Sequence, residues 1–252
     1  MPGLSSPEII LALDVDTLKE AKHFVDLLYP KIKSFKIGSQ LFTACGPEAV
    51  KMIGAKGGKV FLDLKFHDIP NTVYQSVTSG TLTGSTVIFE TARTDMADSA
   101  KDVITPPVFM MTVHIKGGRA MLEAAAKGAV ERSKKLGIKK PLIVGVTRLT
   151  SDEDSVDTLK EVIQAAQLAK VSGLDGVVCS ALEAREVRKA CGEDFVIVTP
   201  GIRSSKDAVG DQKRTSNVKQ AVEAGSDFLV IGRPILKAAD PIAKTEELLG
   251  DL

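Results

Sequence analysis

The chain has 252 residues, and its hydrophobic content of 44% is enough to bury the core of one large α/β domain. Its formal net charge of +1 gives no electrostatic reason to expect nucleic acid or an anionic membrane as a partner, although a local cluster of cations could still bind a phosphate. The absence of Trp and an aromatic content of 4% argue further against a surface on which bases stack.

No segment approaches the roughly 18 apolar residues of a membrane span, and Met1 to Pro7 lacks the features of a signal peptide. The cysteines Cys45, Cys179 and Cys191 are scattered, without a C-x-x-C pair, which is typical of reduced thiols in a cytoplasmic protein. We therefore expect a cytoplasmic protein that makes no contact with membranes.

Short apolar runs alternate along the whole chain with segments in which apolar residues recur at helical spacing. We predict strands over 9–13, Ser34–Gly38, Lys59–Lys65, Val108–Val113, Leu142–Val146, Gly176–Cys179, Phe195–Thr199 and Phe228–Ile231. We predict helices over Leu18–Leu28, Pro47–Ala55, from about Pro70, and over Gly118–Leu136, Val156–Val171, Leu182–Ala190, Asn217–Ala224 and Ala239–Leu249.

Eight β-then-α units in 252 residues predict a (β/α)8 TIM barrel, forming a single domain over 1–252. The alternative is a doubly wound open sheet. No G-x-G-x-x-G follows the first predicted strand, which makes that alternative weaker.

One segment, at about 81–107 between the third and fourth predicted strands, does not fit the regular repeat. It is either an insertion or an extension of the third helix. Three roles are open for it: an extended dimer contact, a cover over the site, or neutral surface.

The stretch from Val60 to Thr72 carries charge where a buried strand should have none. Asp63 and Lys65 are two residues apart, so in a strand they point to the same face, which in a parallel barrel is the interior. Asp68 follows beyond the strand end. Such charges are either a structural ion pair or groups retained for a chemical task.

A second group of polar residues follows the seventh and eighth predicted strands, where such barrels bind phosphate. It comprises the run from Thr199 to Arg203, then Gln212, then Gly232 and Arg233. Glycines let backbone N–H groups approach an anion, and the arginine fork suits phosphate. Ordinary tight turns with surface arginines would give the same pattern.

Three further residues are candidates. Asp14 ends the first predicted strand and Lys36 is a lone cation in an apolar strand, while Thr150 follows the fifth strand. Helix capping alone would explain Asp14 and Thr150. A lysine inside a barrel strand is unusual. The three histidines lack the spacing of a metal site, and none is predicted.

The motif Asp63-x-Lys65-x-x-Asp68-Ile69-Pro70-x-Thr72, together with the run from Thr199 to Arg203, resembles the orotidine 5′-monophosphate decarboxylase family, of the stand-alone prokaryotic type. The resemblance runs from Leu11 to about Pro241, apart from the 81–107 segment. It implies loss of CO2 from orotidine 5′-monophosphate, giving uridine 5′-monophosphate (UMP) in pyrimidine biosynthesis, without a cofactor.

The resemblance also implies a role for each matching residue. Lys65 would be the proton donor, within a charge chain of Lys36, Asp63, Lys65 and Asp68. Asp63 would either repel the substrate carboxylate or hold Lys65 in place. Substrate contacts would come from Asp14, Lys36, Asp68, Ile69, Thr72, Thr150, Arg203, Gln212, Gly232 and Arg233.

In this family Asp68 and Thr72 would enter the site of a neighbouring subunit, which implies a homodimer with shared active sites. The chain departs from the family at Thr112-Val113, where Asn-Val is usual. Two other functions remain open: a related sugar-phosphate lyase that uses Mg²⁺, and a non-catalytic phosphate-binding barrel whose site the insertion has spoilt.

Overall fold

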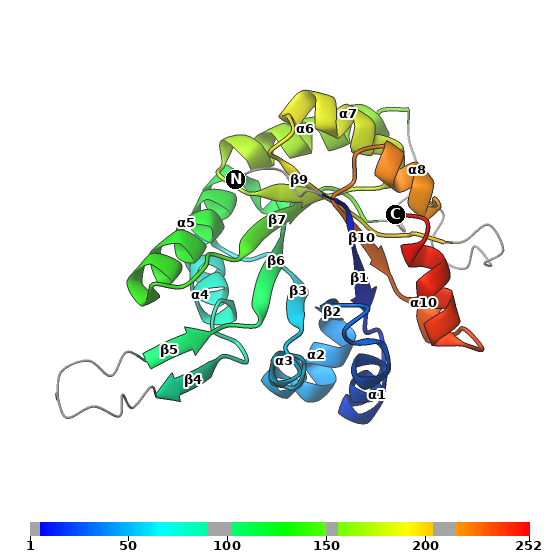
Figure 1. The fold of residues 1–252 in the computed structure, drawn as a ribbon. Helices are drawn as coiled ribbons and strands as arrows, with labels where there is room; N and C mark the ends of the chain where they lie inside the picture. Colours follow the sequence, from blue (N-terminus) through cyan, green and yellow to red (C-terminus); the bar gives the residue numbers. More distant parts are fainter. Residues whose placement is uncertain (1–5, 90–101, 150–155, 204–214) are drawn as a thin grey trace.

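The computed structural model describes residues 6–89, 102–149, 156–203 and 215–252. Within these ranges, eight parallel strands close into a barrel, and helices surround it (Figure 1). The barrel strands, in chain order, are β1 (Glu8–Ala12), β2 (Ser34–Gly38), β3 (Lys59–Phe66), β6 (Val108–His114), β7 (Leu142–Val146), β8 (Gly176–Val178), β9 (Val196–Thr199) and β10 (Phe228–Ile231). The predicted (β/α)8 barrel is confirmed.

The helices follow the strands in the expected alternation. They are α1 (Leu18–Leu28), α2 (Ser39–Cys45), α3 (Pro47–Ala55), α4 (Pro70–Gly80), the short 3₁₀ turn η1 (Ile115–Gly117), α5 (Gly118–Leu136), α6 (Thr158–Val171), α7 (Ala181–Cys191), α8 (Val218–Glu223), α9 (Arg233–Leu236) and α10 (Pro241–Leu249). Helices α2 and α9 were not predicted. They have seven and four residues, and each begins within two residues of the end of the preceding strand, so no loop marks its start.

Several helix starts have a local cause in the sequence. Thr17 and Glu20 form a reciprocal capping box at the start of α1, and Ser180 and Glu183 form another at α7. A break between α2 and α3 falls at Gly46, whose φ of 58° is in the left-handed region that glycine adopts without strain.

The strands separate two hydrophobic cores. The larger lies between the barrel and its helices, while the smaller fills the barrel interior. The interior residues come from alternate positions of the strands, as in Ile10, Phe61, Met110, Val144, Val198 and Val230. The interior is therefore closed by packed side chains below the carboxyl ends of the strands.

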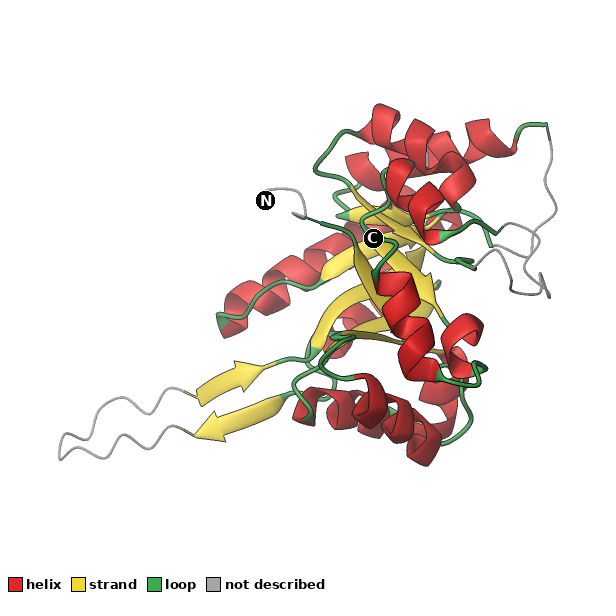
Figure 2. Ribbon diagram, turned by 45° about the vertical axis from the view of Figure 1, so that its right-hand side comes forward, coloured by secondary structure: helices red, strands yellow, loops and turns green. Residues whose placement is uncertain are grey.

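Residues 81–107 contain an antiparallel hairpin of β4 (Thr86–Phe89) and β5 (Asp102–Thr105), which projects from the barrel in both ribbon views (Figures 1 and 2). The segment is an insertion, and the alternative of an extended third helix is wrong, since α4 ends at Gly80. At the base of the hairpin, the Pro107 carbonyl accepts the N–H of Val60 near the start of β3 (2.8 Å). The described part of the hairpin thus leaves from the amino end of the barrel.

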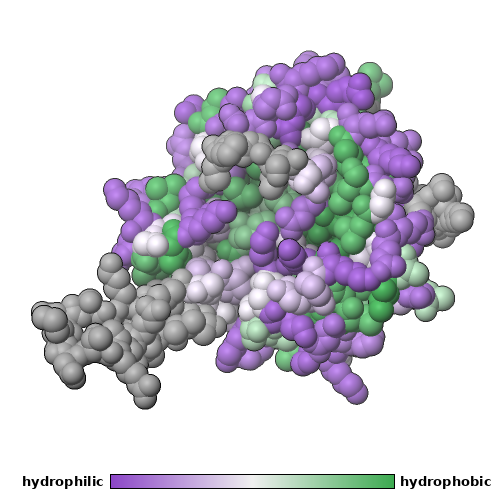
Figure 3. Space-filling model, viewed as in Figure 1, coloured by the Kyte–Doolittle hydropathy of each residue, from purple (hydrophilic) through white to green (hydrophobic). Residues whose placement is uncertain are grey.

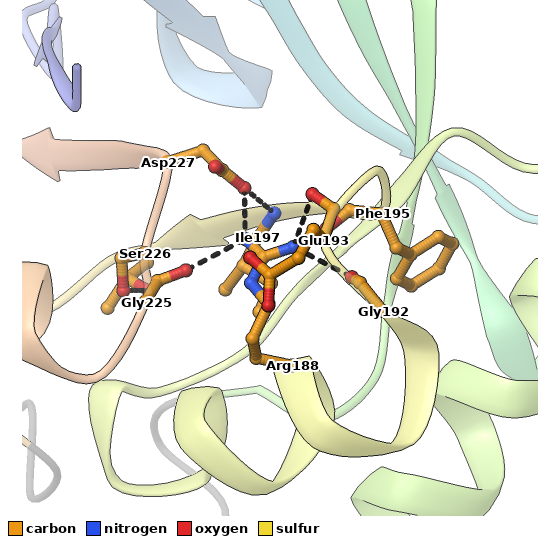
Figure 4. Close-up of polar contacts among 9 residues, drawn as sticks. Arg188, Gly192, Glu193, Phe195, Ile197, Gly225, Ser226 and Asp227 are labelled. Carbon is orange, nitrogen blue, oxygen red and sulfur yellow. Dashed lines mark hydrogen bonds and ion pairs between the residues drawn. The ribbon is translucent and has the colours of Figure 1, made fainter. Parts of the chain in front are cut away.

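The amino end of the barrel is tied together by charged side chains that bond to the backbone. Arg188 on α7 donates to the carbonyls of Gly192 (3.0 Å), Phe195 (2.6 Å) and Gly225 (2.9 Å), and to Asp227 (2.7 Å) just before β10 (Figure 4). The Asp227 carboxylate also accepts the N–H of Ile197 in β9 (2.7 Å).

A second pair repeats this arrangement two strands away. Asp175, just before β8, accepts from Lys140 (2.6 Å) and from the N–H of Ile143 in β7 (2.8 Å). In both places one carboxylate binds a cation and a backbone amide of the neighbouring strand. The pairs therefore fix the spacing of adjacent strands at this end.

Hydrophilic residues dominate the rim of the face shown in Figure 3, with hydrophobic residues visible between them. None of the helices in the described part of the chain combines the length and apolar content that a membrane span requires.

Candidate active site

A pocket of about 490 Å³ opens at the carboxyl ends of the barrel strands. Its lining combines apolar residues from the barrel interior with charged residues from the strand ends. The charged and amide-bearing members are Asp14, Lys36, Gln40, Asp63, Lys65, Arg148, Arg203, Arg233 and Lys237. This is the end at which barrels of this type carry their active sites.

One wall of the pocket is a chain of alternating charges. Lys65 Nζ lies 2.9 Å from Asp63 Oδ2, and Lys36 Nζ lies 3.5 Å from that same oxygen. Lys36 Nζ also contacts Asp14 Oδ1 at 3.1 Å. The structure thus joins Asp14, Lys36, Asp63 and Lys65, with Asp14 at the end opposite Lys65.

The two central groups are almost completely buried, since Lys36 is 9% exposed and Asp63 is 8% exposed. Burial alone would lower the pKa of Lys36, but the charges of Asp63 and Asp14 outweigh it and raise that pKa above its ordinary value. Burial alone would raise the pKa of Asp63, but Lys36, Lys65 and a hydrogen bond from Thr112 outweigh it and lower that pKa. Each group therefore keeps its neighbour ionised.

Lys65 occupies an unusual backbone conformation, with φ of 50°. A non-glycine residue in the left-handed region is uncommon, and such residues gather at functional sites. The register of β3 against β6 shifts between Leu62 and Phe66, which marks a bulge at this point. The prediction that Asp63 and Lys65 share the inner face is confirmed, although Lys65 reaches it through a bulge and not through a regular strand.

Sequence patterns did not reveal how the charges are accommodated. Thr112 on β6 donates to Asp63 Oδ1 (3.0 Å) and accepts the N–H of Lys65 (2.8 Å). A Cβ at Gly38 would lie 2.9 Å from Lys36 Nζ, so glycine at this position leaves room for the ammonium group. The departure from Asn at position 112 was visible in the sequence, but its two partners were not.

The residues that follow β9 and β10 line the pocket on the Asp14 side of the charge chain, away from Lys65. Gly201, with φ of 79°, forms the turn after Pro200, and Arg203 is 8% exposed. Gly232 and Arg233 follow β10 directly and line the same pocket. A Cβ on Gly232 would lie 3.4 Å from Asp14 Oδ2, so this group of cations begins beside the end of the charge chain.

The remaining predicted residues divide into two sets. Asp68, Ile69 and Thr72 are exposed at the start of α4 and do not line the pocket of their own chain. The Asp68 carboxylate accepts the N–H of Ile69 at 2.7 Å. Thr150 and Gln212 lie outside the described residues.

Three of the charged and amide-bearing pocket residues were not predicted. Gln40 on α2 donates to Asp16 (2.6 Å), Arg148 after β7 contacts Glu161 of α6 (2.8 Å), and Lys237 follows α9. Gln40 lies in α2 and Lys237 follows α9, and both helices are too short to recognise from periodicity. Arg148 was passed over within the run that suggested Thr150, although its charge next to a strand end was a usable signal.

Fold and pocket together define a (β/α)8 barrel protein with a charged pocket at the carboxyl ends of its strands. The model of the "Orotidine 5'-phosphate decarboxylase / HUMPS family" matches residues 7–248. Orotidine 5'-phosphate decarboxylases from Moorella thermoacetica and Shewanella sediminis are 41% and 43% identical to this chain, covering 97% and 95% of it and 92% and 94% of their own lengths.

A solved structure gives the same result. The crystal structure of orotidine 5'-phosphate decarboxylase from Lactobacillus acidophilus superimposes with a TM-score of 0.76 at 32% identity, covering 98% of this chain and 99% of that one. The chain belongs to the orotidine 5'-phosphate decarboxylase / HUMPS family.

Proposed function

We propose that the protein decarboxylates orotidine 5′-phosphate to UMP in pyrimidine biosynthesis, with Lys65 as the proton donor. One observation carries the assignment of residues. Lys65 and Asp63 come from β3, Lys36 from β2, Asp14 from the end of β1, and Gly232 and Arg233 from the end of β10. These four strands are consecutive neighbours around the barrel.

The polar groups therefore follow one continuous arc from Lys65 to Arg233. A nucleotide laid along it would have its base at Lys65, its ribose hydroxyl groups at Asp14 and its phosphate at Arg233. The planar donor fork of arginine suits phosphate, and a carboxylate suits hydroxyl groups. Arg203 lines the same pocket as Arg233 and would add donors to the phosphate.

The chemical step needs electrostatic help, because breaking the bond from C6 to the carboxylate leaves an electron pair on C6 with no carbonyl positioned to delocalise it. The Lys65 ammonium would stabilise this carbanion and then transfer a proton to C6, after which solvent reprotonates the amine. Groups that are already oriented toward developing charge need little reorganisation during the reaction. Asp63, bonded to both lysines, would hold Lys65 in place.

The Mg²⁺-dependent lyase is the second candidate, and the structure offers a reason to rank it lower. The ammonium group of Lys36 lies between the carboxylates of Asp14 and Asp63, at 3.1 and 3.5 Å. A divalent cation bridging these carboxylates would have to displace or neutralise that lysine. The non-catalytic alternative is also less well supported, since the described part of the insertion leaves from the end of the barrel opposite the pocket.

The direct test is the loss of ultraviolet absorbance of orotidine 5′-phosphate on incubation with the purified protein, with and without excess chelator. We expect turnover that the chelator does not change. Turnover that stops with chelator and returns with Mg²⁺ would favour the lyase type of chemistry. Nucleotide binding without any turnover would identify a binding protein.

We also propose a twofold homodimer in which Asp68, Ile69 and Thr72 enter the partner's pocket. Their position supports this: all three follow β3, the strand that carries Asp63 and Lys65, and their side chains are exposed outside the pocket of their own chain. The free state of the three cysteines supports a reducing, cytoplasmic location.

Subunit complementation tests the shared site. Lys65→Ala and Asp68→Ala proteins, each inactive alone, are mixed under conditions of subunit exchange. A heterodimer collects both defects in one site and leaves the other intact, so random pairing should restore about a quarter of wild-type activity. No recovery, with exchange verified by mass, would place Asp68 in the site of its own chain.

A further inference from the structure

Thr112 lies on β6, is 0% exposed and does not line the pocket, so it is not placed to touch a bound nucleotide. Its hydroxyl group nevertheless contacts both residues of β3 that carry the proposed chemistry. It donates to Asp63 Oδ1 at 3.0 Å and accepts the backbone N–H of Lys65 at 2.8 Å. One buried hydroxyl thus uses its donor and its acceptor capacity on two different members of the charge chain.

The contact to Lys65 stands where the ladder between β3 and β6 is interrupted. Leu62 pairs with Met111 and Phe66 pairs with Val113, so the three residues 63–65 of β3 stand opposite Thr112 alone. A bulge of this kind removes regular ladder bonds and turns a side chain in a new direction. The threonine hydroxyl accepts the N–H of Lys65, which holds that residue at φ of 50°.

The contact to Asp63 divides the two carboxylate oxygens between different tasks. Oδ1 accepts from Thr112, while Oδ2 faces both Lys65 (2.9 Å) and Lys36 (3.5 Å). Without a donor on Oδ1, the carboxylate could rotate about its bond to Cβ and give up one lysine. The hydroxyl group therefore fixes which oxygen the two ammonium groups share.

We propose that Thr112 is a positioning residue for decarboxylation, which aims the Lys65 ammonium at C6 of the substrate by holding both the bulge and the Asp63 carboxylate. This inference rests on the proposed function. It sets a chemical requirement on position 112: the side chain must donate one hydrogen bond and accept another. Serine meets the requirement, and so does asparagine, whose amide both donates and accepts. Valine has the shape of threonine but meets neither condition.

The test compares Thr112→Val with Thr112→Ser and Thr112→Asn, after wild-type turnover of orotidine 5′-phosphate has been established. We expect kcat of Thr112→Val to fall about 10- to 100-fold, the size of loss that a small misplacement of a reacting group produces. We expect Thr112→Ser and Thr112→Asn to stay close to wild type. The Kd for UMP, which is held through ribose and phosphate and has no carboxylate at C6, should change little in all three.

Several outcomes would overturn the proposal. One is a Thr112→Val protein with near wild-type kcat. Another is a Thr112→Ser protein as impaired as Thr112→Val, which would assign the effect to packing. A parallel loss of UMP affinity in Thr112→Val would show general damage to the pocket.

If Thr112→Val does not fold, Thr112→Ala, which removes the hydroxyl without adding a methyl group, takes its place with the same expectations. Failure of the proposed function would be seen separately, as an inactive wild-type protein.

Discussion

The two ends of the barrel use the same kinds of charged residue in different ways. At the amino end, Asp227 and Asp175 each pair with a cation and also accept an N–H from the adjacent strand. At the carboxyl end, Lys36 and Lys65 contact carboxylates, and their ammonium groups line an open pocket.

The two ends differ in the further hydrogen bonds that each charged group makes. The guanidinium group of Arg188 donates to backbone carbonyls as well as to Asp227, so little of its capacity is left for a ligand (Figure 4). At the carboxyl end the charged groups pair with one another and line the pocket, so their electric field is concentrated inside it. Proteins commonly give up stability in such sites in return for activity. We therefore expect changes at one end to affect folding and changes at the other to affect turnover.

The largest effect is expected at Lys65. Lys65→Ala should lower turnover by at least about 10²-fold, since a proton donor contributes roughly 10²–10⁴-fold. Affinity for UMP and the midpoint of urea unfolding should remain close to wild type. Steady-state kinetics, equilibrium binding and circular dichroism measure the three quantities. A variant that keeps more than about a hundredth of the activity would remove Lys65 from the role of proton donor.

The matching change at the amino end is Arg188→Met. It leaves the partly buried Asp227 carboxylate without its cation and several carbonyls without a donor. We expect a loss of about 3–5 kcal/mol in the free energy of unfolding, the usual result of removing one member of a buried pair. Turnover by the folded variant should be unchanged.

Arg185→Met is the control for Arg188→Met, because Arg185 is an exposed arginine on the same helix whose contact to the Glu223 carbonyl is 3.4 Å long. Its unfolding free energy should shift by less than about 0.5 kcal/mol. If Arg188→Met slows turnover while leaving stability intact, the division between the two ends does not hold.

A smaller effect is expected at Arg233. Arg233→Ala should weaken kcat/KM for orotidine 5′-phosphate by about 10- to 100-fold, the range for hydrogen bonds to a charged group. Turnover of the nucleoside orotidine, which lacks the phosphate, should be insensitive to the same change. Equal losses with nucleotide and nucleoside would mean that Arg233 supports the structure of the pocket instead of binding phosphate.

The smallest expected effect is the dependence of stability on pH that Asp63 contributes. Its pKa is lowered in the folded protein, so the unfolded chain binds the proton more readily. The contribution is fully present above the ordinary carboxyl pKa of about 3.9 and is lost as the pH falls through the lower folded value. In urea unfolding between pH 6 and pH 3, Asp63→Asn should therefore lose less stability than wild type. An identical decline in both proteins would contradict this linkage.

The sequence could predict the barrel because each strand is a short apolar run followed by a helix, and such runs depend on neighbouring residues only. It could also place Asp63 and Lys65 on one face by alternation along a strand, although in the structure Lys65 reaches that face through a bulge that alternation does not foresee. The partnership of Thr112 with these residues could not be predicted. It depends on the register of β6 against β3, and a bulge sets that register.

The space that Gly38 leaves for Lys36 Nζ is likewise a property of the folded side chains. Helix α2 escaped prediction because it is seven residues long and only Gly46 separates it from α3. The hairpin was recognised as an irregularity, but two four-residue strands separated by 90–101 carry too weak a pattern for their pairing to be foreseen.

The β4–β5 hairpin has a practical consequence for protein engineering. Thr86 pairs with Thr105, so the chain leaves and re-enters the barrel framework at adjacent points. Lengthening such a closed loop is inexpensive, at about 0.6 kcal/mol for each doubling. A peptide tag or a reporter domain grafted between the two strands would lie on the side of the barrel remote from the pocket. Such a tag could tether the enzyme to a surface while the opening of the pocket faces the solution.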